Sequence, residues 1–122
     1  MAELVDISLV SVEPGLVVFE GKAAEFHYNL GGVAHGGYAC TMLDSALGCA
    51  VTSLLPAGKS CTTTDLHVRF VRPITVATGA LRCEAAVLHL GKTLATAEAR
   101  ITDAAGKLYA HGTTACAILD EK

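Results

Sequence analysis

One acidic residue, Asp44, lies inside an otherwise apolar stretch of the chain. The run His35-Gly36-Gly37 stands where that stretch begins. A carboxylate can serve as a general base or as a nucleophile. Backbone N–H groups in the first turn of a helix have no partner within the helix, so glycines there can hold an oxyanion or let a carbonyl group approach closely. These residue types could therefore polarise a carbonyl group and activate the attack on it.

The spacing alone leaves other roles open for each of these residues. Asp44 could be a structural residue at a subunit interface, hydrogen-bonded to backbone or hydroxyl groups. Gly36 and Gly37 could simply permit a tight loop. His35 could transfer a proton, but a histidine at the entry to a helix more often orients the loop by hydrogen bonding, and we favour that role.

Three other kinds of site are not supported by the sequence. A phosphate-binding loop fails, because Gly31–Gly36 has the G-x-x-x-x-G spacing but is followed by Gly37-Tyr38 instead of Lys and Ser or Thr. No second histidine has zinc-ligand spacing from His35, so no metal site is expected. Cys40 could be a nucleophile, but no sequence feature pairs it with a base.

The element that carries Asp44 is predicted to be a helix beginning at Gly36 and stopped by Pro56 and Gly58. Its apolar positions recur at three- and four-residue spacing: Ala39, Met42, Leu43, Ala46, Leu47, Ala50, Val51 and Leu54. Asp44 falls on the opposite flank, with Thr41, Ser45 and Gly48. An Asp within this stretch is costly in a bilayer, so a buried helix is expected rather than a membrane span.

Strands are predicted on both sides of this helix. Two precede it, joined by a turn at Pro14-Gly15. Four follow it, beginning beyond Lys59, where Leu66, Val68 and Phe70 alternate with polar residues. The last runs from about Leu108 to Leu119. Two strands, one helix and four strands joined by short turns predict an α+β architecture, an antiparallel sheet that covers one helix.

The chain as a whole indicates one domain, residues 1–122. It is 52% hydrophobic and 17% charged, more apolar than so small a domain easily buries, which predicts a subunit interface. The net charge of -3 gives no basic stripe, so nucleic acid is not expected as a partner. The five cysteines are scattered and never form C-x-x-C, which favours a reducing compartment, the cytoplasm. The acidic N-terminal run has no basic region, so neither a secretory signal nor a membrane anchor is expected.

The run from Asn29 to Asp44 resembles the signature of the hotdog-fold acyl-CoA thioesterases of the phenylacetate-pathway (PaaI-like) type. The positions that carry it are Asn29, Gly32, His35, Gly36 and Gly37, followed by Asp44 nine residues after the histidine. The later strands are similar to the family too, including the F-x-R-P segment Phe70–Pro73 and the turn Gly91-Lys92. The resemblance implies a long curved antiparallel sheet wrapped around a central helix, in homodimers that often pair into homotetramers.

The same resemblance implies a role for each site residue. Asp44 would be the catalytic carboxylate, and the Gly36 amide would polarise the thioester carbonyl. Asn29 would lie near the leaving sulfur or the lytic water, and a hydroxyl at Thr63 would position that water. Each site would use two subunits, with Asn29 and Gly36 of one chain facing Asp44 and Thr63 of the other. Neighbouring threonines on both sides of Thr63 leave that last assignment open.

For the substrate, the resemblance implies an acyl-CoA with an aryl or a short-to-medium acyl group, and no cofactor, because coenzyme A is part of the substrate. Tyr38 is a candidate to line the acyl pocket, and Gly37 is a candidate to let the substrate carbonyl approach the backbone closely. Arg72 and Lys92 are candidates to bind the phosphates of the nucleotide, although surface charges or structural ion pairs are the commoner roles for such residues.

These residues leave open both the mechanism of Asp44 and the function of the site. Asp44 could activate water or attack directly through an anhydride. A non-catalytic acyl-CoA-binding or sensing module is the main alternative to a thioesterase, but a pure binder has no need for a carboxylate beside a thioester. A hotdog hydratase or dehydratase would need a differently spaced Asp/His pair.

Overall fold

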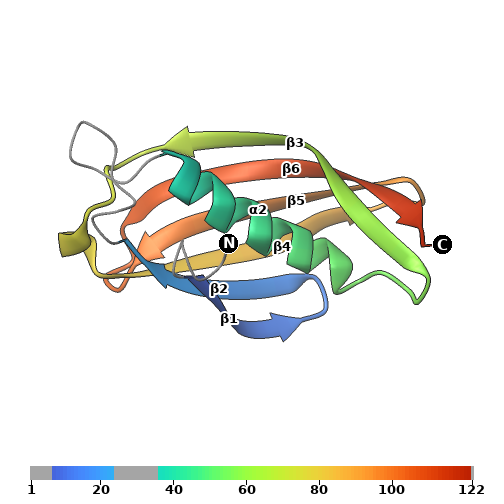
Figure 1. The fold of residues 1–122 in the computed structure, drawn as a ribbon, viewed down its shortest axis with the longest axis horizontal. Coiled ribbons are helices and arrows are strands. Elements are labelled where there is room, and N and C mark those ends of the chain that lie inside the picture. Colours follow the sequence, from blue (N-terminus) through green and yellow to red (C-terminus); the bar gives the residue numbers. More distant parts are fainter. Residues whose placement is uncertain (1–6, 24–35, 122) are drawn as a thin grey trace.

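The computed structural model describes residues 7–23 and 36–121. These form six strands, one α-helix and a short 3-10 turn (Figure 1). In chain order they are β1 (Ile7–Glu13), β2 (Leu16–Lys22), α2 (Gly36–Thr52), β3 (Lys59–Phe70), η2 (Val76–Thr78), β4 (Ala80–Leu90), β5 (Leu94–Asp103) and β6 (Leu108–Asp120).

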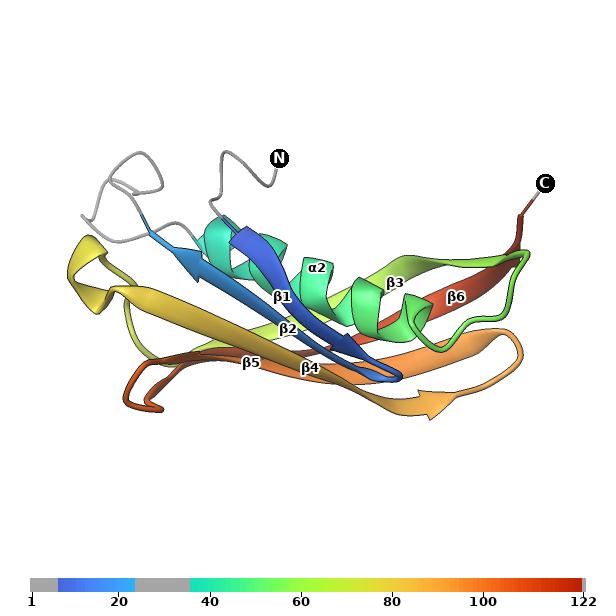
Figure 2. The same ribbon diagram turned by 90° about the horizontal axis from the view of Figure 1, so that it is seen from below.

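The six strands make one sheet in the order β1-β2-β4-β5-β6-β3, and every neighbouring pair is antiparallel. The sheet is long and curved, and α2 lies along its concave side, as the two perpendicular views show (Figures 1 and 2). The predicted α+β architecture, an antiparallel sheet wrapped around one helix, is confirmed. Strands β1 and β3 form the two edges of this sheet.

The hairpin β1–β2 turns at Pro14-Gly15, as predicted, and Glu13 pairs with Leu16. Gly15 has a φ of 77°, a conformation that L side chains rarely adopt, which explains a glycine at this position. Its N–H donates a 2.8 Å hydrogen bond to the Ser53 hydroxyl, just beyond α2. The hairpin is therefore tied to the C-terminal end of the helix.

Helix α2 buries the apolar stripe that the sequence predicts, and Leu54 alone of that stripe lies beyond the helix end and is half-buried. The helix ends at Thr52 because the next backbone bonds, from Leu54 and Leu55, reach back three residues instead of four. Pro56 then disfavours helical geometry in the residue before it. No helix among the described residues combines the length and apolarity needed to cross a membrane.

In the centre of the core, large side chains of the helix pack against several small side chains of the sheet. Met42, Leu43 and Leu47 of α2 are fully buried. Alongside larger buried residues such as Leu81 and Ile101, the sheet beneath them contributes five buried alanines: Ala85, Ala95, Ala97, Ala99 and Ala110. Large helix side chains that pack onto these small strand side chains let α2 lie close to the sheet.

Candidate functional site

Asp44 and Thr63 form the polar pair at the centre of the candidate site. Asp44 is an exposed residue on the flank of α2 that faces the edge strand β3. The Thr63 hydroxyl donates a 2.8 Å hydrogen bond to Asp44 Oδ1. A hydrogen bond to an ionised carboxylate is stronger than one between neutral groups, so it fixes the orientation of the acid.

A β-bulge in β3 decides which threonine meets Asp44. Thr63 pairs with Cys116 and Asp65 with Ala115, so Thr64 is an extra residue between them. The Thr64 hydroxyl donates instead to the Ala115 carbonyl, at 2.9 Å. The structure thus brings Thr63 to the carboxylate and directs Thr64 to the neighbouring strand.

Two hollows share Asp44, Ser45 and Thr63 and extend from them in opposite directions along α2. The first, which we call the Cys40 hollow, is also lined by Cys40, Thr41 and Leu66. The second, the Gly48 hollow, is also lined by Leu9, Val12, Gly48, Cys49, Thr52, Ser53 and Cys61. A substrate that extends on both sides of a reacting carbonyl would fit this arrangement.

Asp44 is the sole charged group among the described residues that line the two hollows. Burial raises the pKa of the Cys40 thiol, and the nearby Asp44 carboxylate raises it further. Burial, and then the neighbouring Cys61, raise the pKa of Cys49. Thiols with raised pKa values stay protonated at neutral pH, so Asp44 is the better base or nucleophile here.

Gly36 and Gly37 are exposed at the N-terminus of α2, where backbone N–H groups lack helical partners. Gly36 packs beside Phe70, since a Cβ placed there would lie 3.1 Å from the tip of that ring. Asp44 is eight positions after Gly36, a rise of about 12 Å along the helix. Within one chain, the Gly36 amide and the Asp44 carboxylate cannot contact the same carbonyl group.

Tyr38 is not brought to the hollows. It is 3% exposed, and its hydroxyl lies 3.0 Å from where a Cβ on Gly21 of β2 would be. The side chain of Met42, one turn later, crowds the same position. Tyr38 therefore packs in the core between α2 and β2. Its spacing of four from Met42 was the sequence signal for this placement.

Arg72 and Lys92 lie far from each other. Arg72 follows β3 and donates a 2.8 Å hydrogen bond from Nη1 to the Leu108 carbonyl. Lys92 is exposed in the turn between β4 and β5, next to Thr93, which pairs with Ile118 at the other end of β6. Strand β6 separates these two points by about 30 Å, so the two cations cannot grip one phosphate group.

Two predicted site residues, Asn29 and His35, lie outside the described residues. Within residues 7–23 and 36–121, no group of three His, Cys, Asp or Glu side chains is arranged to hold a metal ion. Leu9 and Val12, which line the Gly48 hollow, were missed by sequence reasoning because their contact with the helix flank depends on the order of strands in the sheet.

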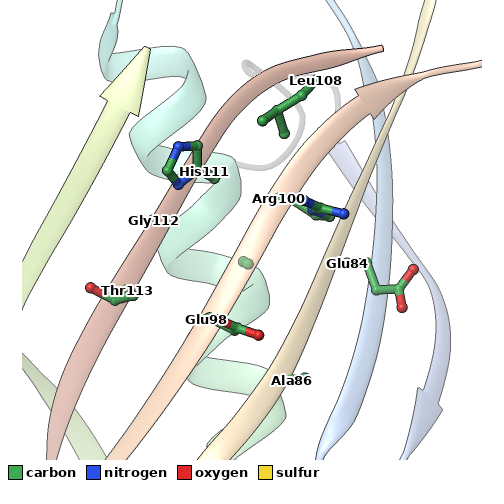
Figure 3. Close-up of a pocket in the computed structure, with 9 residues that line it drawn as sticks. Glu84, Ala86, Glu98, Arg100, Leu108, His111, Gly112 and Thr113 are labelled. Carbon is green, nitrogen blue, oxygen red and sulfur yellow. The ribbon is translucent and has the colours of Figure 1, made fainter. Parts of the chain in front are cut away.

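A further hollow lies on the outer face of the sheet, with the helix behind the strands (Figure 3). It is lined by Glu84, Glu98, Arg100, His111 and Thr113, among others. These residues alternate along their strands with core residues such as Ala97 and Ala99. The outer hollow is therefore separated from Asp44 by the thickness of the sheet.

Comparison with known proteins identifies the family and the fold. A family model described as the thioesterase superfamily matches residues 31–110. Human acyl-coenzyme A thioesterase 13 is 35% identical over 107 residues, covering 87% of this chain and 75% of that protein.

Solved structures with the same architecture include thioesterase superfamily member 2 of zebra fish, with a TM-score of 0.82, 32% identity and coverage of 92% of this chain and 80% of that one. The PaaI protein from the phenylacetic acid degradation operon of E. coli gives a TM-score of 0.89 at 22% identity, covering 99% of this chain and 85% of that one. The predicted hotdog fold is confirmed. With the family match over most of its length, the chain belongs to the thioesterase superfamily.

Proposed function

We propose that this protein is an acyl-CoA thioesterase in which Asp44 is the catalytic carboxylate. One observation carries the proposal: the Thr63 hydroxyl holds Asp44 at the point shared by two hollows that lead in opposite directions. The name of its human relative, acyl-coenzyme A thioesterase 13, supports a coenzyme A thioester as the substrate. The acyl group is aryl or of short-to-medium length.

The reaction needs few protein groups because a thiolate leaves readily. As a general base, Asp44 removes a proton from water, and the hydroxide attacks the carbonyl carbon. The C–S bond then breaks, the thiolate of coenzyme A takes up the proton, and the free acid remains. As a nucleophile, Asp44 would instead form an anhydride that water hydrolyses. Thr63 positions the carboxylate in either mechanism.

The oxyanion donor comes from a second chain in this proposal. The separation of about 12 Å between Gly36 and Asp44 along α2 requires it. We propose a homodimer, or a homotetramer made of two dimers, in which Gly36 and Asn29 of one protomer face Asp44 and Thr63 of its partner. His35 orients the loop that leads to Gly36, and Gly37 allows the substrate close to the backbone. No cofactor or metal takes part.

Coenzyme A would extend from this site over the surface, where Arg72 or Lys92 meets its phosphates. A location in the cytoplasm fits the five free cysteines, because thiols persist in a reducing compartment.

The test is thiol release from a panel of aryl and straight-chain acyl-CoAs by the wild type, Asp44→Asn and Asp44→Ala. We expect each variant to lose on the order of a hundredfold or more in kcat, the scale of general-base catalysis, with unchanged fold and oligomeric state. Turnover equal to the wild type in both variants would remove Asp44 from the mechanism. Binding of acyl-CoA by a wild type that releases no thiol would favour an acyl-CoA-binding module instead.

A further inference from the structure

The Gly48 hollow is an apolar extension of the site. Its only charged lining residue among those described is Asp44, at one end. Leu9 and Val12 of the edge strand β1 form one wall and are 50% and 52% exposed. Large apolar side chains that are half exposed to solvent near the Asp44 carboxylate indicate a surface that an apolar ligand covers.

The polar groups at the far end of the Gly48 hollow are engaged within the protein. The Ser53 hydroxyl accepts a hydrogen bond from the Gly15 N–H and donates one to the Ala50 carbonyl. Thr52 Oγ1 lies 3.5 Å from Cys61 Sγ in a shared hydrogen bond. A ligand at this end therefore meets groups with no need of a polar partner, which favours a hydrocarbon occupant.

The length of the hollow follows from the helix. Asp44, Gly48 and Thr52 are spaced by four and lie on one face of α2, so they span about 12 Å. An extended aliphatic chain advances by roughly 1.25 Å per carbon, given C–C bonds of about 1.52 Å, so roughly ten carbons cover this distance. A benzoyl or phenylacetyl ring would occupy only the part beside Asp44.

Gly48 keeps the middle of this path open. Among the described residues, a Cβ placed on Gly48 would meet no atom within 4 Å, so this part of the chain leaves space open above the helix backbone there. A larger side chain would extend from this position into the Gly48 hollow. Gly48 is also in the interior of a helix, where glycine is less favourable than alanine, and an open path for a ligand explains its presence.

We infer that the Gly48 hollow holds the acyl chain and that the preferred substrate class is straight-chain acyl thioesters of roughly eight to ten carbons, with Gly48 setting the length limit. The inference rests on the proposed thioesterase function and narrows it from aryl or short-to-medium acyl groups to one class. The Cys40 hollow, on the other side of Asp44, is then left for the thiol portion of the substrate.

The test compares kcat/KM for butyryl-, hexanoyl-, octanoyl-, decanoyl- and phenylacetyl-CoA in the wild type and in Gly48→Leu. In the wild type, kcat/KM should rise with chain length by up to roughly fourfold per added methylene and level off near ten carbons. Gly48→Leu should lower kcat/KM for decanoyl-CoA by about tenfold or more and leave butyryl-CoA nearly unchanged. Equal activity on all chains, or a Gly48→Leu variant that treats them as the wild type does, would overturn the inference.

A second pair of variants tests the wall. Val12→Ser should reduce the preference for long chains, whereas Val10→Ser should not, because Val10 is equally exposed at 51% on the same strand but does not line the hollow. Light scattering on each variant completes the test. A changed oligomeric state in Gly48→Leu would mean that a subunit covers the hollow, and would overturn the inference.

Binding measurements separate this inference from the proposed function. Calorimetric titration with decanoate and butyrate needs no turnover. If the wild type releases no thiol but binds decanoate more tightly than butyrate, and Gly48→Leu loses that difference, the acyl path stands and the thioesterase proposal fails. If thiol release is efficient but neither rate nor binding depends on chain length, the thioesterase proposal stands and the acyl path fails.

Discussion

The Thr63 hydroxyl donates a 2.8 Å hydrogen bond to Asp44 Oδ1, which joins the edge strand β3 to the exposed flank of α2. Nineteen positions of sequence separate the two residues. Because one partner comes from a helix and the other from a bulged strand, their distance depends on how the helix lies on the sheet. The acid is held by tertiary structure rather than by its own helix.

This hydrogen bond predicts the effect of removing the Thr63 hydroxyl. Thr63→Val should lower kcat by roughly 10- to 100-fold, since a hydrogen bond to a charged group contributes about 1.5–3 kcal/mol. Thr63→Ser keeps the donor and should retain most activity. Steady-state thiol release measures both, with Thr62→Val as the matched control. A Thr63→Val variant as active as the wild type would mean that Asp44 needs no positioning by Thr63.

The role of the Gly36 amide can be tested by proline. Proline is well tolerated at the first position of a helix, where its missing N–H would have no helical partner. Gly36→Pro should therefore keep the fold but lower kcat by about 100- to 1000-fold, the usual effect of losing one oxyanion donor.

Gly36→Ala is the steric control for this variant, because the nearest atoms to its Cβ among the described residues would be those at the tip of the Phe70 ring, a side chain that is 59% exposed. It keeps the N–H and should stay far more active than Gly36→Pro. Equal losses in the two variants would assign the effect to crowding rather than to the amide.

A site shared between two chains predicts complementation. Asp44→Asn and Gly36→Pro should each be nearly inactive alone. Mixed under conditions that exchange subunits, they should regain roughly a quarter of wild-type activity, because half of the dimers are mixed and each of those has one intact site. Activity that stays at the level of the separate variants, despite exchange shown by mass spectrometry, would place both residues in the same chain's site.

The turn between β5 and β6 predicts a pH dependence of stability. Asp103 accepts hydrogen bonds from the Lys107 and Ala105 N–H groups and from the Tyr109 hydroxyl, each at 2.9 Å. The hydrogen bond from the Lys107 N–H has the largest effect and lowers the pKa of Asp103. Desolvation raises this pKa, but the hydrogen bonds from the Tyr109 hydroxyl and the Ala105 N–H lower it further, so that it lies below the ordinary value of 3.8.

A lowered folded-state pKa means that this stabilisation is complete above pH 3.8 and is lost as the pH falls through the folded value. The free energy of unfolding, measured by urea denaturation from pH 7 to pH 2, should fall more steeply at the acid end for the wild type than for Asp103→Asn. Between pH 5 and pH 7 the two curves should run parallel. Equal slopes at the acid end would exclude Asp103 as a source of the acid sensitivity.

Glycines in different backbone conformations predict opposite changes in stability. Gly48→Ala should raise the free energy of unfolding by about 0.5–1 kcal/mol, because alanine is the better helix residue and its Cβ meets no atom of residues 7–23 and 36–121 within 4 Å. Gly58→Ala should lower it by roughly 1 kcal/mol, because Gly58 has a φ of 85°. Urea denaturation measures both changes, and a destabilised Gly48→Ala would show that the space above the helix is already filled.

Local patterns predicted much of this fold. The three- and four-residue spacing of apolar positions located α2 and its buried face, and the alternation beyond Lys59 located β3. The helix ends at Thr52 rather than near Leu55 because its last turn tightens before Pro56, a change that apolar spacing does not register. The order of the strands in the sheet depends on non-local pairing, which the periodicity of a single strand does not encode.

The site was predictable to a smaller extent. The flank of α2 that carries Asp44, Ser45 and Gly48 followed from helical spacing, and these three residues do line one hollow together. The choice of Thr63 over its neighbours depends on a bulge that only the pairing with β6 reveals. Tyr38 was a candidate to contact the acyl group, but its side chain lies in the core, a placement that its spacing of four from Met42 could have indicated.

The alanines beneath α2 have a consequence for how this protein can change over evolutionary time. Ala97 and Ala99 are buried and line neither the Cys40 hollow nor the Gly48 hollow, yet their small volume helps to set how far the helix stands from the sheet, and so the gap between Asp44 and Thr63. A single added methyl group at either position would push the helix away from the sheet. Selection for activity should therefore restrain side-chain volume at positions in the middle of the sheet as strictly as it restrains the identity of the acid.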